Sequence, residues 1–477
     1  MSLKKETIKG FVWSFLQQFS TQLITFLVQI VLARVLLPSE FGLIGMLTVF
    51  IGIATAFFEG GMTSSLIRVS KTDTRDYSTV FFFNLGVSLL VYLLFFAFAP
   101  YIALFYKQPL LTDIARIYGL SFVFLAFGTV QNTILIREMK FKKQAVITFP
   151  ALLSGSFLGV VLAYNNFGVW SLVYSMLLTN LLTSVFLWFS SDWRPEFIFD
   201  IDKFKLHFHF GYKMTISSLL DTVFTNIYQI IIGRIYSPVT VGYYTRANSL
   251  MMLPVGNISV ALNKVVFPLF AKVQDDISAL REAYKKIMLI VLFIVTPIIV
   301  LMALLGNELV VFLFTEKWLP VVPIFQIICF SGILYPLHMY NLLILQVKGR
   351  SDLFLRLEVI KKIILIFIIL ISVFYGFTAL LFGYVIASII ALFINTHYAG
   401  SIIDYTMKRQ LFDIFPIFAI SICMGLIVFL VNNNLIAYNN ISRLVISSIV
   451  GTIIYIFLAF VFKFQTLSDI RNIIKKQ

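Results

Sequence analysis

The sequence predicts an all-α membrane protein that crosses the bilayer many times, with about fourteen transmembrane helices. Three observations support this fold class. Charged residues make up 12% and hydrophobic residues 60% of the 477 residues, whereas a soluble domain carries roughly 25% charged residues. The mean hydropathy is +0.95. The apolar residues form continuous runs, such as 359–375 and 376–395, which is typical of spanning helices and not of the alternating strands of a membrane barrel.

Each expected span is an apolar run bounded by polar or charged residues. The first run is too long for a cleavable signal peptide, so we expect it to be a true span. In chain order the expected spans cover about 9–33, 42–67, 77–105, 109–135, 144–164, 168–190, 211–235, 240–270, 284–305, 320–347, 357–375, 377–397, 410–431 and 442–462.

The positions of Lys and Arg predict the orientation. With the N-terminus in the cytoplasm, 29 of the 37 Lys and Arg residues fall in cytoplasmic segments, as the positive-inside rule requires. We therefore expect both termini in the cytoplasm. The net charge of +15 then reflects topology and contact with anionic membrane lipids, and it does not imply a nucleic-acid partner. The amphipathic stretch 191–212 is expected to lie along the cytoplasmic surface.

An internal repeat relates the first and seventh expected helices. Arg34, Pro38 and Gly42 recur as Arg234, Pro238 and Gly242, an offset of 200 residues. This offset predicts a parallel repeat of two six-helix lobes, followed by two additional helices. The expected domains are an N-terminal lobe at 1–190, a cytoplasmic linker at 191–212, a C-terminal lobe at 213–397, and the two additional helices with a cytoplasmic tail at 398–477.

A polar stripe is repeated along the same two helices. The first helix carries Gln18, Thr21, Gln22, Thr25 and Gln29, and the seventh carries Ser218, Asp221, Thr222, Thr225 and Gln229 at the same offset of 200 residues. This spacing places each set on one helix face. Such stripes line a central cavity or hold helices together. We favour the cavity, with Gln18, Gln22, Gln29 and Gln229 as substrate-binding residues.

Charged residues within the expected spans are the other candidate site residues, since a charge in mid-membrane costs roughly 2.5–3.5 kcal/mol. Arg246, Asn257 and Lys264 share one face of the eighth helix. Arg116 lies in the fourth helix, Asp221 in the seventh and Glu59 at the end of the second. We expect Arg246, Lys264, Arg116 and Asn257 to contact an anionic substrate, and Asp221 or Glu59 to couple transport to an ion.

Structural roles remain open for each of these charges. Arg116 and Arg246 could reach the outer surface, and Arg116 could pair with Asp113. Lys264 could reach the cytoplasm, and the two carboxylates could be ion-pair partners of these cations. The two cysteines are expected to be small apolar residues within spans. The spacing of the four histidines indicates no metal site, and we expect no cofactor.

Four stretches carry a family resemblance. The run from Gly242 through Tyr243-Tyr244-Thr245-Arg246-Ala247-Asn248 to Pro254, and the later Val266-Phe267-Pro268-Leu269-Phe270, resemble polysaccharide exporters of the colanic-acid and teichuronic-acid type. Ala33–Gly42 and Phe58–Arg68 look like the region of the first two helices in the same exporters. These proteins group with O-antigen (Wzx-type) flippases in the multidrug/oligosaccharidyl-lipid/polysaccharide superfamily.

The resemblance implies a bacterial inner-membrane flippase with fourteen helices in two lobes. Its substrate would be a polyprenyl-diphosphate-linked oligosaccharide, moved from the cytoplasmic to the periplasmic leaflet by alternating access for the assembly of O-antigen, lipopolysaccharide or exopolysaccharide. A polysaccharide polymerase is a candidate partner, and a proton or sodium ion is a candidate coupling ion.

Two other functions compete with this one. A multidrug antiporter of the same superfamily is opposed by the number of spans and by the net positive charge within them. A membrane polysaccharide polymerase is opposed by the short outer loops, so we expect no enzymatic activity.

Overall fold

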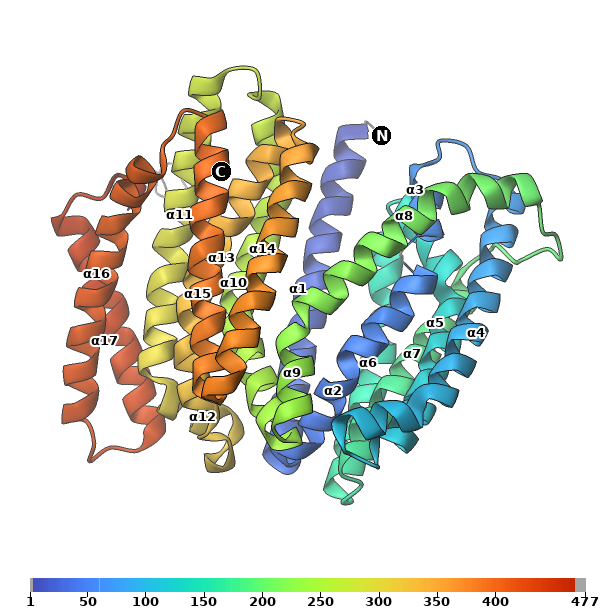
Figure 1. Cartoon of the computed structure of the whole chain (residues 1–477), viewed down its shortest axis with the longest axis horizontal. Coiled ribbons are helices and arrows are strands. Elements are labelled where there is room, and N and C mark those ends of the chain that lie inside the picture. The colour runs from blue at the N-terminus through green and yellow to red at the C-terminus, as the bar shows by residue number, and fades with distance from the viewer. Residues whose placement is uncertain (1–2, 60, 468–477) are drawn as a thin grey trace. The chain divides into compact units, whose positions relative to one another are not determined.

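The computed structural model describes residues 3–59 and 61–467, except for the side chains of 3–12, 14, 15, 59 and 257–265. The regular structure in this part of the chain is helical (Figure 1). Each of the fourteen expected spans coincides with a helix or a helix pair. Eleven helices are long and apolar enough to cross a membrane, or twelve if one bent pair counts as a span. The protein is therefore a multi-pass helical membrane protein, and the expected count of fourteen holds as an approximation.

The chain divides into two compact units, unit 1 (Met1–Thr245) and unit 2 (Arg246–Gln477). The division falls within a helix and lies C-terminal to the linker expected at 191–212. Unit 1 contains α1 (Leu3–Val35), α2 (Pro38–Glu59), α3 (Met62–Arg68), α4 (Thr74–Tyr106), α5 (Leu111–Arg137), α6 (Phe141–Tyr164), α7 (Val169–Ser190), α8 (Ile201–Thr225), α9 (Ile227–Ile235) and the first turns of α10 (Pro238–Lys272).

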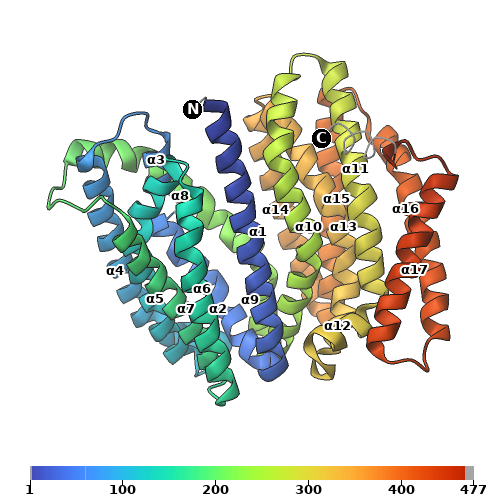
Figure 2. The same ribbon diagram turned by 180° about the vertical axis from the view of Figure 1, so that it is seen from behind.

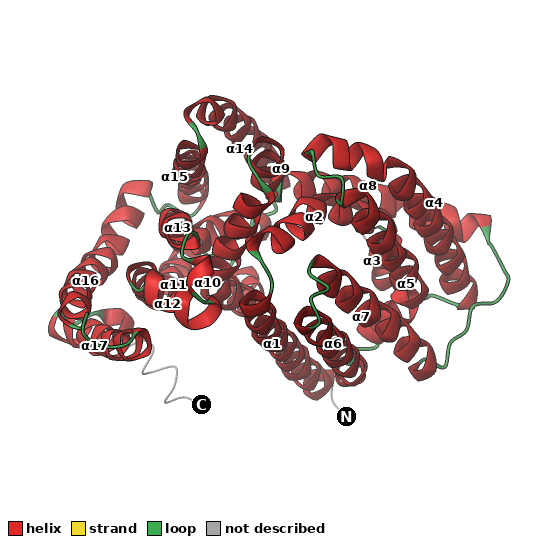
Figure 3. Ribbon diagram, turned by 90° about the horizontal axis from the view of Figure 1, so that it is seen from below, coloured by secondary structure: helices red, strands yellow, loops and turns green. Residues whose placement is uncertain are grey.

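Unit 1 is a bundle in which sequence neighbours pack together. Seen from below, α6 lies beside α7, with α5 against α7 and α1 against α6 (Figure 3). The α6–α7 pair is especially close, because a Cβ atom on Gly155 of α6 would lie 2.0 Å from Thr179 Oγ1 of α7. Small residues at such crossings let helix backbones approach in a bilayer.

Unit 2 contains the rest of α10, then α11 (Ile277–Leu304), α12 (Gly306–Phe314), the short 3-10 helix η1 (Glu316–Trp318), α13 (Val321–Val347), α14 (Ser351–Ser372), η2 (Val373–Tyr375), α15 (Phe377–Ile402), α16 (Met407–Asn434) and α17 (Asn440–Val461). Helix α13 packs against α11 and α15, and α16 packs against α11 and α17 (Figure 2).

The seventh expected span is broken. The sequence predicts one helix over 211–235, but α8 begins earlier, at Ile201, and meets α9 at a bend of 48°. The break lies at Asn226, whose side-chain Nδ2 donates to the carbonyl oxygen of Thr222 at 2.8 Å. A side chain that bonds to its own helix backbone competes with the regular hydrogen-bond ladder and favours a bend. Asp221 therefore lies on α8 and Gln229 on α9, so the stripe does not follow one straight helix.

The two copies of the repeated Pro–Gly motif contact each other within unit 1. A Cβ atom on Gly42 would lie 1.7 Å from the carbonyl oxygen of Pro238, and one on Gly242 would lie 2.0 Å from the carbonyl oxygen of Pro38. The starts of α2 and α10 thus touch backbone to backbone, and the contact is reciprocal. Any side chain at either glycine would separate these two helices.

Candidate functional site

A polar cavity of about 560 Å³ lies inside unit 1, between α1, α5, α6 and α7. Amide and hydroxyl side chains supply its polar lining, and no charged side chain is among the described lining residues. The cavity offers many hydrogen-bonding groups without a net charge, which suits a ligand rich in hydroxyl groups. The polar lining residues are Gln17, Gln18, Thr21, Gln22, Thr129, Asn132, Gln144, Thr148 and Thr183.

Local hydrogen bonds orient several of these groups. Gln144 Nε2 donates to Asn132 Oδ1 at 2.9 Å, which joins the start of α6 to the end of α5. Thr129 and Thr148 each donate to a carbonyl of their own helix, at 2.8 and 2.9 Å. A hydroxyl that has donated its proton still offers two lone pairs. The threonines can therefore accept hydrogen bonds from a ligand in the cavity.

Cationic groups lie near this cavity rather than in its lining. The ammonium of Lys142, two residues before Gln144, lies 5.5 Å from the ring centre of Trp13 on α1. Arg137 at the end of α5 is engaged elsewhere, because it donates to Tyr77 and to the backbone at Val69 and Ser70 at 2.8–2.9 Å. The sequence predicts a cationic central cavity between two lobes, and the polar cavity of unit 1 is a different one that does not test that prediction. The cavity within unit 1 is neutral, with basic residues near one end.

Two of the predicted substrate-binding glutamines line this cavity. Gln18 and Gln22 do so together with Thr21 of the same stripe. Gln29 lies seven residues beyond Gln22, about 10 Å further along α1, and Gln229 lies on α9. Neither is part of the cavity lining. Of the polar stripe on α1, only Gln18, Thr21 and Gln22 line this cavity.

Two of the predicted cations stack on aromatic rings. The guanidinium carbon of Arg116 lies 4.5 Å from the ring centre of Phe96, and its Nε donates to the Phe96 carbonyl at 3.4 Å. The structure records no ion pair of Arg116 with Asp113. The guanidinium carbon of Arg246 lies 5.1 Å from the ring centre of Phe314 and 5.4 Å from that of Trp318, all within unit 2. Stacking of this kind stabilises arginine in an apolar environment.

For the remaining predicted site residues the structure gives the helix but few side-chain contacts. Asp221 lies in the last turns of α8, before the bend. The side chains of Glu59, Asn257 and Lys264 lie outside the part of the chain that the structure describes. The roles assigned to these residues remain predictions.

Lys361 and Lys362 are mid-helix cations that the sequence reasoning placed on the cytoplasmic side. They lie ten and eleven residues into α14, about 15 Å from its start. Lys361 Nζ forms an ion pair with Glu358 Oε1 at 2.5 Å. The sequence places both lysines near the cytoplasmic start of the span expected at 357–375, but α14 begins earlier, at Ser351, so they lie deeper in a helix than expected.

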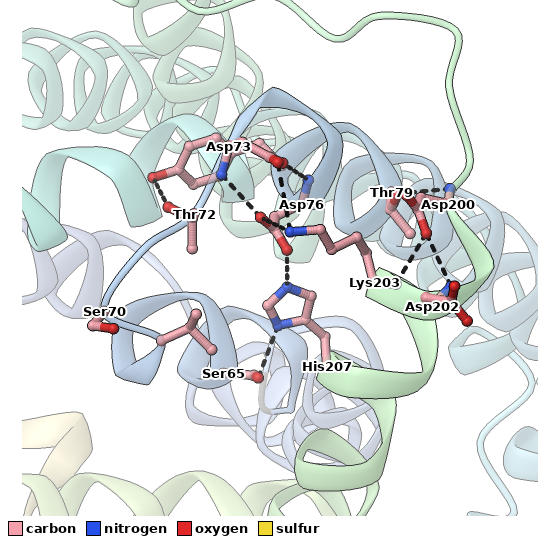
Figure 4. A network of polar contacts seen from close by, with 12 residues as sticks. Ser65, Ser70, Thr72, Asp73, Asp76, Thr79, Asp200, Asp202, Lys203 and His207 are labelled. Atoms are coloured by element: carbon pink, nitrogen blue, oxygen red, sulfur yellow. Dashed lines mark hydrogen bonds and ion pairs between the residues drawn. The ribbon is translucent and has the colours of Figure 1, made fainter.

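A second cluster, which sequence reasoning missed, joins α3, α4 and α8 (Figure 4). Asp76 on α4 accepts a hydrogen bond from Lys203 Nζ at 2.8 Å through Oδ2, and Oδ1 lies 3.0 Å from His207 Nε2. His207 Nδ1 lies 2.9 Å from Ser65 Oγ. Asp76 and His207 are fully buried, and both come from segments that the sequence predicts outside the spans. This Asp76 cluster joins α8 to α3 and α4 within unit 1.

The chemical order Ser65–His207–Asp76 is that of a hydrolase triad, but the arrangement is structural. Ser65 is 2% exposed, and it lies on α3, the helix whose Met62 and Leu66 belong to an apolar core that includes Phe81. A nucleophile in this position has no access to a substrate. Two further bonds attach the irregular segment before α8 to α4: Ser78 Oγ accepts from the Glu196 N–H and Thr79 Oγ1 from the Asp200 N–H, at 3.1 and 3.0 Å.

Asp73 and Lys203, which contact Asp76, make the stability of the folded protein depend on pH. The backbone N–H of Asp76 donates to Asp73 and lowers the pKa of that carboxyl below 3.8. The hydrogen bond to Asp76 raises the pKa of Lys203 above 10.5. The contribution of Asp73 is therefore lost as pH falls through its lowered pKa, and that of Lys203 as pH rises through its raised pKa. Between about pH 4 and 10 both contributions are present.

The stability that Lys203 contributes is lost as pH rises through its raised pKa. We expect Lys203→Gln to lack this contribution, and therefore also its loss at high pH. The melting temperature of the purified protein, measured against pH, should differ from that of the native protein mainly below pH 10.5. Lys205→Gln, an exposed lysine of the same helix, is the control and should leave the profile unchanged. Identical profiles for Lys203→Gln and the native protein would contradict the assignment.

Comparisons with known proteins connect this arrangement to one family. The model of a family described as polysaccharide biosynthesis protein matches residues 31–323. The chain is 26% identical over 372 residues to the lipopolysaccharide biosynthesis protein WzxC of Escherichia coli strain K12, covering 77% of this chain and 75% of that protein. It is also 26% identical over 469 residues to the teichuronic acid biosynthesis protein TuaB of Bacillus subtilis strain 168, covering 96% of both.

Solved structures share the fold. The lipid II flippase MurJ in an inward closed conformation matches with a TM-score of 0.78 at 16% identity, over 94% of this chain and 98% of that one. An inward-facing multidrug resistance MATE family transporter of the MOP superfamily matches with a TM-score of 0.63 at 20% identity, over 81% of this chain and 96% of that one. At these identities the likeness establishes the fold alone.

Proposed function

Because the chain belongs to the family of polysaccharide biosynthesis proteins, we propose that it is a flippase. It moves a polyprenyl-diphosphate-linked oligosaccharide from the cytoplasmic to the periplasmic leaflet for the assembly of a surface polysaccharide. The observation that carries this proposal is the uncharged polar cavity of unit 1. Amides and hydroxyls are the groups that hydrogen-bond to sugar hydroxyls without needing a charge on the ligand.

The substrate has three chemically different parts, and the chain offers an environment for each. The sugars bind the amides and hydroxyls of the cavity. The diphosphate binds embedded cations, for which we retain Arg246, Lys264 and Arg116 and add Lys361 and Lys362. Arginine suits phosphate because its planar fork donates two parallel hydrogen bonds. The polyprenyl chain stays in the bilayer, and transport needs only alternating access, with no covalent step.

The proposal includes a location and an orientation. We place the protein in a bacterial cytoplasmic membrane, and the distribution of Lys and Arg supports an orientation with both termini in the cytoplasm. The polar cavity then lies toward the cytoplasmic side, because Lys142 and the ends of α5 and α7 belong to that side. A loaded lipid made in the cytoplasmic leaflet meets this cavity first. Asp221 and Glu59 remain the proposed coupling residues.

A multidrug antiporter is the second candidate, because a MATE transporter shares the fold. The neutral lining of the described cavity favours sugars over cationic drugs, for which an acidic site is expected. Deletion of the gene distinguishes the candidates. A flippase mutant accumulates lipid-linked oligosaccharide in the cytoplasmic leaflet, whereas an antiporter mutant becomes drug-sensitive without such an intermediate. A polymerase mutant would accumulate flipped, unpolymerised units.

We expect Gln18→Leu/Gln22→Leu to reduce polymer export about tenfold, since each lost hydrogen bond costs about 0.5–1.5 kcal/mol. Export is measured as surface polysaccharide in a deletion strain that carries the variant, with the protein level checked by immunoblot. Asn434→Leu, which replaces an exposed amide at the end of α16, is the control and should export normally. Normal export by the double variant would remove these glutamines from the substrate path.

A further inference from the structure

A second cavity, of about 470 Å³, lies within unit 2 between the starts of α11 and α16. Its charged lining residues come from two helices that are far apart in the sequence. Four are cations and two are carboxylates, so the charged side chains of the lining carry a net positive charge. These residues are Arg281, Glu282, Lys285, Lys408, Arg409 and Asp413. We call this cavity the α11–α16 cleft.

Internal ion pairs account for two of the four cations. Lys285 Nζ lies 2.9 Å from Asp413 Oδ2. Arg281 Nη1 lies 3.2 Å from Asp404 Oδ2 and donates to the Asp404 carbonyl at 3.3 Å. For Lys408 and Arg409 the described part of the structure contains no ion pair or side-chain hydrogen bond. Two cations at the mouth of the cleft are therefore available to an anion.

The wall of the cleft is held rigidly. Tyr405 is buried and donates its hydroxyl to Asp413. Gln410 Nε2 donates to the Tyr405 carbonyl at 2.9 Å, and Tyr284 donates to Gln410 Oε1 at 3.1 Å. Tyr284 and Gln410 are buried in turn. Burial and the Asp413 carboxylate raise the pKa of Tyr405, so its hydroxyl stays protonated and keeps donating. The loop that leads to Lys408 and Arg409 is thus fixed before any ligand binds.

The position of the cleft suggests what kind of anion it meets. Lys408 and Arg409 lie in the first turn of α16, whose unpaired N–H groups and dipole also favour an anion. Phe412 lines the same cleft and is 79% exposed, and Phe415 one turn further is 69% exposed. A cationic mouth above exposed aromatic residues at a helix end matches a lipid, with its phosphate at the interface and its acyl chains in the bilayer.

We propose that the α11–α16 cleft binds the phosphate of an anionic glycerophospholipid. The positive-inside rule accounts for basic loops, but it does not require cations from two distant helices to converge on one preformed cavity. Basic pockets between helices on the cytoplasmic side of a membrane, where the proposed orientation places this cleft, are suited to anionic headgroups. The site is separate from the sugar cavity of unit 1, and the proposal does not depend on the proposed function.

Native mass spectrometry of the full-length protein with added phosphatidylglycerol tests the site. The variant Lys408→Gln/Arg409→Gln should bind phosphatidylglycerol at this site about 30-fold more weakly, since each basic residue contributes about 1 kcal/mol. Its spectrum should therefore show one bound lipid fewer than that of the native protein. Lys408→Arg/Arg409→Lys keeps both charges and should bind like the native protein. Lys71→Gln/Arg75→Gln removes two exposed cations that do not line the α11–α16 cleft and should also retain the lipid.

Two further probes identify the ligand. Phosphatidylcholine, whose headgroup is zwitterionic, should bind much more weakly than phosphatidylglycerol, and excess inorganic phosphate should not displace the bound lipid. Equal lipid binding by Lys408→Gln/Arg409→Gln and the native protein would overturn the proposal. So would displacement by free phosphate, because the site would then bind the ion rather than a lipid headgroup.

Discussion

Gly42→Val should prevent the protein from accumulating in the membrane. The Cβ atom alone would lie 1.7 Å from the carbonyl oxygen of Pro238, and a main-chain atom cannot rotate away as a side chain can. Overpacking a core costs about 1–3 kcal/mol even where side chains can adjust. We therefore expect a loss of more than about 3 kcal/mol, which is a large fraction of the roughly 5–15 kcal/mol that separates a native protein from its unfolded state. Protein level and melting temperature, measured on a fluorescent fusion, check this result.

Two matched variants give this prediction its control. Gly242→Val should fail in the same way, because its Cβ atom would lie 2.0 Å from the Pro38 carbonyl oxygen. Gly86→Val in α4 should be accepted, since a Cβ atom there meets nothing within 4 Å. A normal level and melting temperature for Gly42→Val would mean that the starts of α2 and α10 do not touch.

Asp76→Ala is expected to have the second-largest effect. It would remove the partner of buried His207 and the main ion pair of Lys203. A buried polar group that loses its hydrogen-bond partner costs about 1–3 kcal/mol, and both His207 and Lys203 would lose Asp76. The melting temperature of the purified protein should fall by many degrees, and α8 should become sensitive to protease. Asp202→Ala, an exposed carboxylate in the first turn of α8, is the control.

A double variant tests whether Asp76 and His207 stabilise the protein through their contact with each other or independently. Asp76→Ala/His207→Ala should cost less than the sum of the two single changes, because both remove the same interaction. Strict additivity would show that the two side chains do not act as a unit. A native melting temperature for Asp76→Ala would show that the cluster does not fasten α8 at all.

The sequence predicted the elements well because each span is solvated by lipid and must be continuously apolar. The fourteen runs, the repeat of Pro38 and Gly42, and the placement of Gln18 and Gln22 on one helix face all follow from local patterns. The break in the seventh helix does not. Asn226 reads as one more polar residue of a span, and only the structure reveals its bond to Thr222.

The site residues were harder to predict because they depend on contacts between helices. Asn132, Gln144 and Thr148 are ordinary polar residues in separate spans until the packing of α5 and α6 brings them to one cavity. Asp76 and His207 are 131 residues apart, and nothing in their local sequence relates them. Lys361 and Lys362 were missed for a different reason. Their charge suggested the cytoplasmic end of the span expected at 357–375, whereas α14 begins at Ser351 and carries them near its middle.

The reciprocal contact between Gly42 and Gly242 has a consequence for the origin of the chain. If residues 38–42 and 238–242 belonged to two identical subunits, each glycine would face the proline carbonyl of the other copy, as in an isologous interface on a two-fold axis. One short sequence would then satisfy both sides of a homodimer. Duplication and fusion of the gene for such a subunit would join the two copies in one chain. The reciprocal crossing of α2 and α10 has the form that such a fusion would leave, and the difference between Thr21 and Asp221 shows that the two copies are no longer identical.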